Sequence, residues 1–126
     1  MVVFGLRTLL ETWKARAVPQ HPRKTFGIVI DLAQREKLFE QLERFANAHD
    51  FDIHIGSTTP AGVTYNIYMT GKDVYLIANN PFDSRGYDFA IYDKDPTNLV
   101  SEEVIDSLIK DLKTYISEVP NVRIFD

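Results

Sequence analysis

The spacing of apolar residues changes at Asp50, from a helical period of about 3.6 to the period of two that is typical of a half-buried strand. Beyond this residue, large apolar side chains alternate with others in segments 51–55, 63–69, 74–78 and 87–92. Turn residues, mainly Gly, Pro and Asn, separate these segments. Because consecutive strands joined by hairpin-length links must pair antiparallel, we predict an antiparallel sheet in the middle of the chain.

A strand and a helix are predicted before this region. Segment 26–30 is a short apolar run rich in β-branched residues, which predicts a strand. Asp31 follows it directly, and we expect its side chain to cap a helix over 32–49. The apolar residues of this helix share one face: Leu38, Leu42, Phe45 and Ala46.

A second helix is predicted after Ser101, a favourable capping residue that two acids follow at the helix start. Its apolar stripe is the clearest helical pattern in the sequence: Val104, Ile105, Leu108, Ile109, Leu112 and Ile116. Pro120 and Asn121 then turn the chain into a short strand over 122–125.

The predicted order of elements is β-α-β-β-β-β-α-β, preceded by a short amphipathic helix that Pro19 ends. Both long helices must lie on one face of the sheet to bury their apolar stripes. We therefore expect an α+β fold with five to six mostly antiparallel strands, a ferredoxin-like core with an added hairpin. Residues 1–24 are interpreted as an N-terminal helix with a linker, and residues 25–126 as a single domain.

Composition restricts the fold and the chemistry further. The chain has 126 residues, 44% of them hydrophobic, which is enough to bury a core without cross-links. It has no Cys, so disulfides, thiolate metal sites and a Cys nucleophile are excluded, while the compartment stays undetermined. No apolar stretch is long enough to span a bilayer, and the first ten residues match a secretory signal poorly.

Charge is distributed unevenly along the chain. Residues 1–24 carry five basic side chains and one acidic, a net charge of +4, whereas the remainder carries 9 basic and 17 acidic, a net charge of −8. Because an acidic body repels phosphate backbones, we expect no nucleic-acid binding. The alternative for the basic N-terminal helix is contact with anionic lipid, in which Leu6, Leu10 and Trp13 enter the membrane interface while Arg7 and Lys14 face the lipid headgroups.

Strict alternation gives the predicted sheet two faces with large apolar side chains. One set is expected to face the helices: Tyr65, Ile67, Leu76, Phe89 and Ile91. The other set then points away from them: His54, Tyr68, Tyr75, Ile77 and Tyr92. Contiguous exposed apolar patches larger than roughly a few hundred Å² usually mark contact surfaces. Three interpretations follow: the N-terminal helix with Trp13 folds over this face, a partner or second copy binds it, or it holds a small-ligand groove.

The sequence contains no signature of catalysis, nucleotide binding or metal binding. The three His residues lack the spacing of a helical zinc pair. Asp93 and Asp95 lack the Gly and Glu of a calcium loop, and aspartates in such turns commonly bond backbone amides. We therefore expect no cofactor and no metal, and we favour a non-enzymatic role.

The leading hypothesis is a protein-interaction domain that binds a partner, or a second copy as a homodimer. The residues predicted to bind lie on the second sheet face and in the loop over 79–86: Tyr68, Tyr75, Ile77, Tyr92, Asn80, Phe82 and Arg85. One alternative is peripheral membrane association through the N-terminal helix. The other is a small-ligand or hydrolytic site in a groove between sheet and loop, built from some of Asp52, His54, Asp83 and Arg85.

Overall fold

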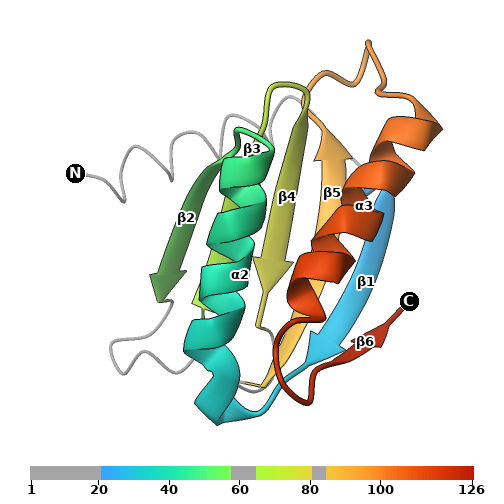
Figure 1. Cartoon of the computed structure of the whole chain (residues 1–126). Helices are drawn as coiled ribbons and strands as arrows, with labels where there is room; N and C mark the ends of the chain where they lie inside the picture. The colour runs from blue at the N-terminus through green and yellow to red at the C-terminus, as the bar shows by residue number, and fades with distance from the viewer. Residues whose placement is uncertain (1–20, 58–64, 81–84) are drawn as a thin grey trace.

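A computed structural model describes residues 21–57, 65–80 and 85–126 of the chain. In these ranges, a six-stranded antiparallel sheet carries two α-helices on one of its faces (Figure 1). The predicted α+β class, with an antiparallel sheet and two helices, is therefore confirmed. The predicted N-terminal helix lies outside the described residues.

The strands are β1 (Lys24–Val29), β2 (Asp52–Ser57), β3 (Tyr65–Thr70), β4 (Val74–Asn79), β5 (Gly86–Asp93) and β6 (Arg123–Phe125). The helices are α2 (Arg35–Ala48), which follows the short 3₁₀ turn η1 (Leu32–Gln34), and α3 (Glu102–Ile116). The spatial order of the strands is β2-β3-β4-β5-β1-β6. The four central strands of the sequence thus form a meander, and β1 lies between β5 and β6.

The chain enters α2 through η1 rather than directly from β1. The carbonyl of Asp31 accepts a hydrogen bond from the amide of Gln34 at 2.8 Å, but the Asp31 side chain makes no capping bond. The prediction that Asp31 caps the long helix is wrong. Three residues of tighter helix separate it from Arg35, so its carboxylate lies too far along the chain to reach the first amides of α2.

The capping prediction for α3 is confirmed, because the Ser101 hydroxyl accepts a hydrogen bond from the Val104 amide at 3.3 Å. Four residues of the predicted stripe are buried: Ile105, Ile109, Leu112 and Ile116. The assignment of Val104 to this stripe is wrong, since its side chain is 48% exposed. Adjacent helix positions differ by about 100°, so the rotation that buries Ile105 turns Val104 outward.

The core lies between the helices and the sheet, and both sides contribute fully buried residues. The main ones are Leu38, Leu42 and Phe45 of α2, Leu112 of α3, and Ile67, Leu76, Phe89 and Ile91 of the strands. Each large apolar side chain removed from water contributes roughly 1.5–3 kcal/mol to stability. The helices are also joined directly, since His49 Nε2 lies 2.6 Å from Asp111 Oδ2.

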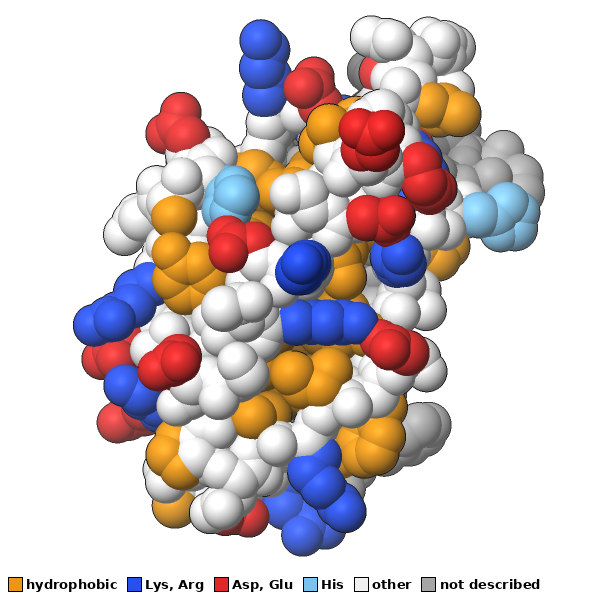
Figure 2. Space-filling model, turned by 45° about the vertical axis from the view of Figure 1, so that its right-hand side comes forward, with side chains coloured by type: hydrophobic (Ala, Val, Ile, Leu, Met, Phe, Trp, Pro, Cys, Tyr) orange, Lys and Arg blue, Asp and Glu red, His pale blue; other side chains and the backbone are white. Residues whose placement is uncertain are grey.

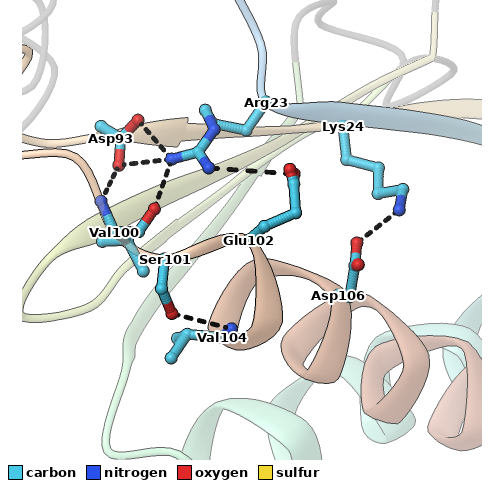
Figure 3. Close-up of polar contacts among 8 residues, drawn as sticks. All are labelled: Arg23, Lys24, Asp93, Val100, Ser101, Glu102, Val104 and Asp106. Carbon is cyan, nitrogen blue, oxygen red and sulfur yellow. Dashed lines mark hydrogen bonds and ion pairs between the residues drawn. The ribbon is translucent and has the colours of Figure 1, made fainter.

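Asp93, at the end of β5, is a buried carboxylate that ties three parts of the chain together (Figure 3). It is only 3% exposed, and its oxygens accept hydrogen bonds from Arg23 Nη1 at 2.9 and 3.1 Å. The amide of Val100 donates a further bond at 2.9 Å, and the Val100 carbonyl accepts one from Arg23 at 2.8 Å. The start of β1, the end of β5 and the loop before α3 are therefore held at one point.

Two residues counted in the basic N-terminal segment are paired with acids of the body. Besides the Arg23 bonds to Asp93, Lys24 Nζ lies 2.5 Å from Asp106 Oδ1, and this hydrogen bond raises the pKa of Lys24 above its ordinary value. Figure 2 shows acidic side chains gathered over the amino-terminal part of α3, where Glu102 and Glu103 occupy the first turn. Arg23 and Lys24 thus belong to the body and do not contribute to a separate basic arm.

Asp93→Ala is expected to lower the free energy of unfolding by about 2–4 kcal/mol, because Arg23 and the Val100 amide lose a buried charged acceptor. Urea denaturation of the full chain measures the change. Asp73→Ala, which removes an exposed carboxylate next to β4, serves as the control and is expected to stay within about 0.5 kcal/mol of wild type. A loss below about 1 kcal/mol for Asp93→Ala would show that other contacts hold this point.

Tyr87, near the start of β5, carries a buried hydroxyl group. The side chain is 1% exposed, and its oxygen has no hydrogen-bond partner among the described residues. Its ring meets the edge of the Phe39 ring, with centroids 6.5 Å apart. Burial raises the pKa of Tyr87 to about 12, because the phenolate would lose its hydration inside the core.

Tyr87→Phe is expected to leave stability unchanged or to raise it by about 1 kcal/mol, because the hydroxyl is desolvated without gaining a bond. The folded pKa exceeds the unfolded value of about 10, so the unfolded state loses its proton first and the Tyr87 contribution falls between about pH 10 and 12. Denaturation of both proteins across this range measures the difference. A large loss of stability at neutral pH would contradict an unbonded hydroxyl.

Candidate functional site

The sheet face that points away from α2 and α3, here called the outer face, carries the predicted aromatic residues. Strand pairing aligns one row of side chains across five strands: His54, Tyr68, Ile77, Ala90 and Thr25. The next row aligns Asp52, Thr70, Tyr75 and Tyr92. Tyr68, Tyr75, Ile77 and Tyr92 are all half-buried. The structure therefore brings the four predicted sheet residues together on one surface.

A third row on the outer face has polar side chains in the middle and a glycine at each end. Asn66, Asn79 and Asp88 lie side by side on β3, β4 and β5. Gly56 precedes them on β2, and Gly27 follows them on β1. A row of polar residues and glycines thus borders the row of aromatic and aliphatic residues.

A hollow of about 670 Å³ opens on the outer face over β4, β5, β1 and β6. It exists because Gly27 and Ala90, on adjacent strands, have little or no side chain, whereas their neighbours stand above the sheet. The taller residues around the hollow are Val29, Ile77, Tyr92 and Phe125. This volume falls in the range that binding pockets commonly have.

Two carboxylates line the hollow, and its described lining includes no Lys or Arg. A side chain at Gly27 would place its Cβ 3.3 Å from Asp88 Oδ1, so the Asp88 carboxylate lies over the glycine. Asp126 is paired with Lys113, and this hydrogen bond lowers the pKa of Asp126 below its ordinary value. Asp88 is exposed, so its charge acts directly on anything that enters the hollow.

The cations near the outer face lie against its rings at opposite ends. Lys94 Nζ lies 5.6 Å from the centre of the Tyr75 ring and donates a hydrogen bond to the Gly71 carbonyl at 3.0 Å. The Arg123 guanidinium lies 5.9 Å from the centre of the Phe125 ring. The hollow therefore combines apolar walls with two carboxylates, and the Arg123 cation lies at its rim against Phe125.

The predicted loop residues are placed only in part. Asn80 is 4% exposed, and its side-chain amide donates a hydrogen bond to the Gly86 carbonyl, which braces the two ends of the loop. Arg85 is exposed, and its carbonyl accepts a hydrogen bond from the Ile30 amide at 2.9 Å. Phe82 and Asp83 lie outside the described residues.

The residues of the hydrolytic alternative do not come together where the structure describes them. Asp52 and His54 lie on β2, whereas Arg85 directly precedes β5, and β3 and β4 lie between. Three strand spacings correspond to about 14 Å, which is too far for a common substrate atom. The residues predicted to contact membrane, Leu6, Arg7, Leu10, Trp13 and Lys14, lie outside the described ranges.

The described residues offer neither a metal-binding cluster nor a membrane-spanning helix. These parts of the chain hold no cluster of three or more His, Cys, Asp or Glu side chains that could bind a metal ion. In the same parts, no helix has both the length and the apolar character needed to cross a membrane.

Sequence reasoning missed the hollow itself. Gly27 and Ala90 are far apart in the chain, and they form one floor only because β1 pairs with β5. A glycine inside a predicted strand was the available signal, since such glycines often mark close approach of a ligand or another backbone. Neither the protein-family models nor the curated protein sequences contain a match to this chain.

Proposed function

We propose that this chain is a non-enzymatic protein-interaction domain whose outer face binds an exposed segment of a partner protein. The observation that supports this proposal most is the hollow over Gly27 and Ala90, with its apolar walls and the Asp88 carboxylate. A matching segment would place one or more large apolar side chains in the hollow and a Lys or Arg next to Asp88. Complementary charge of this kind favours specificity and rapid association.

The strand order supports a second, structural proposal, that the domain elaborates the ferredoxin-like arrangement. If β3 and β4 are left out, the remaining order is β6-β1-β5-β2 around two helices, which is the ferredoxin-like pattern. The hairpin of β3 and β4 is then the addition. Because this hairpin supplies Tyr68, Tyr75 and Ile77, it widens the outer face.

Membrane association through Leu6, Arg7, Leu10, Trp13 and Lys14 stays a prediction, because these residues lie outside the described part of the chain. This alternative requires lipid and gives Ala90 no role, so it differs from binding at the outer face. The test below therefore addresses the outer face alone.

Ala90→Trp is expected to occupy the floor of the hollow and to weaken partner binding at least about tenfold. Full-length protein is used to select peptides from a random displayed library, and the affinity of enriched peptides is then measured for wild type and variants. We expect enrichment of peptides that combine aromatic or aliphatic residues with Lys or Arg. Asp88→Lys is also expected to weaken binding of the same peptides and to reduce the salt dependence of that binding.

The control for Ala90→Trp is Ala48→Trp, the same substitution at an exposed position in the last turn of α2. Asp73→Lys, at an exposed carboxylate beside β4, is the control for Asp88→Lys. Both controls should bind the selected peptides as wild type does. Failure to enrich any peptide, or equal binding by Ala90→Trp and Ala48→Trp, would refute the proposal.

A further inference from the structure

The edge strand β2 has the features of a pairing surface for a second copy of this chain. In the part of the chain that the structure describes, β2 has β3 as a neighbour on one side and no strand on the other. An edge strand presents unpaired backbone amides and carbonyls, which form a template for another strand. The opposite edge, β6, has only three residues, so β2 with its six residues is the longer template.

β2 lacks two of the usual devices that prevent such pairing. Proline and lysine are common protective residues on exposed edges, and β2 has neither. Toward the helices, the edge places three apolar side chains that are only half-buried and pack on the margin of the core: Phe51, Ile53 and Ile55. Toward the outer face, it places Asp52 and His54, both exposed. Each face of the edge therefore leaves contacts for a neighbouring strand to complete.

One antiparallel register of two β2 strands gives favourable side-chain contacts on both faces of the joint sheet. When the two strands are centred on Ile53, Asp52 lies opposite His54 of the second copy, and His54 lies opposite its Asp52. On the helix side, Ile53 meets its own equivalent, and Phe51 lies opposite Ile55. Directly opposed side chains in a sheet contact each other, so two carboxylate–imidazole pairs and an apolar cluster form together.

Neighbouring registers are poorer for physical reasons. Centring on Asp52 places two carboxylates directly opposite each other, which is destabilising. Centring on His54 places Asp52 opposite Gly56, so the Asp52–His54 pairs do not form. A shift to a centre between two residues places the helices of the two copies on opposite sides of the joint sheet, because side chains alternate between faces. Compared with these neighbouring registers, the one centred on Ile53 forms both Asp52–His54 pairs and keeps the helices of the two copies on one face.

We infer that β2 mediates antiparallel self-association of this chain, with Ile53 at the two-fold axis and two Asp52–His54 pairs between the copies. The two sheets then continue into one, with the helices of both copies on the same face. The outer face extends across both copies, so this interface leaves the hollow over Gly27 and Ala90 open. The inference does not depend on the proposed function, because β2 contributes no residue to the lining of the hollow.

The first test uses the charge pattern. Sedimentation velocity of the full-length chain over a wide concentration range should show a monomer–dimer equilibrium. His54→Asp places two carboxylates opposite each other and should weaken the dimer at least about tenfold, whereas Asp52→His/His54→Asp restores the opposite pairs and should return the affinity to within about threefold of wild type. His21→Asp, the same change at another exposed His, is the control and should have no effect.

The second test uses the absence of Cys from the chain. Under mild oxidation, Ile53→Cys should form a disulfide between copies, because residues at the two-fold axis have Cα atoms roughly 4.5–5.5 Å apart. Ile55→Cys is the matched control on the same face of the same strand. Its equivalents lie four residues apart along the strand, about 13 Å, so it should stay uncross-linked.

Three outcomes would overturn the inference. The first is a wild-type chain that stays monomeric throughout, and the second is a dimer that His54→Asp leaves intact. The third is equal cross-linking of Ile53→Cys and Ile55→Cys, which would show contact without the proposed register. A dimer that Ala90→Trp disrupts and His54→Asp does not would place self-association on the outer face and would refute β2 pairing, whereas the peptide selection tests the proposed function separately.

Discussion

The pairing of β1 with β5 is the contact on which the rest of this structure depends. It joins the first described strand to the last strand of the meander, and β6 then adds to the free side of β1. The bonds of Arg23 and Val100 with Asp93 hold the end of this pair and the start of α3 together. Without this junction, α3 would have no fixed position over the sheet, and Gly27 would not lie beside Ala90.

The two faces of the sheet have different physical roles because both described helices lie on one of them. The face under α2 and α3 is filled by side chains that are almost fully buried, and it supplies the stability of the domain. The outer face mixes half-buried rings, a polar row and a hollow over two small residues. Such a surface contributes less to folding than the core does.

Several features could be predicted because they depend on neighbours in the chain. The alternation after Asp50 predicted four strands, and Ser101 predicted the start of α3. Errors arose where a small local change decides the geometry. The turn η1 displaced the start of α2 from Asp31, and the rotation of α3 left Val104 in solvent.

The sequence alone determined the elements, their antiparallel pairing in the meander, and which side chains share a face, because periodicity is a property of consecutive residues. Only the tertiary structure decided that Arg23 bonds Asp93, and that Gly27 and Ala90 form one floor beneath Ile77 and Tyr92. It also decided that β2 lies at an edge of the sheet. These facts depend on the register and order of strands distant in the chain, which local spacing does not encode.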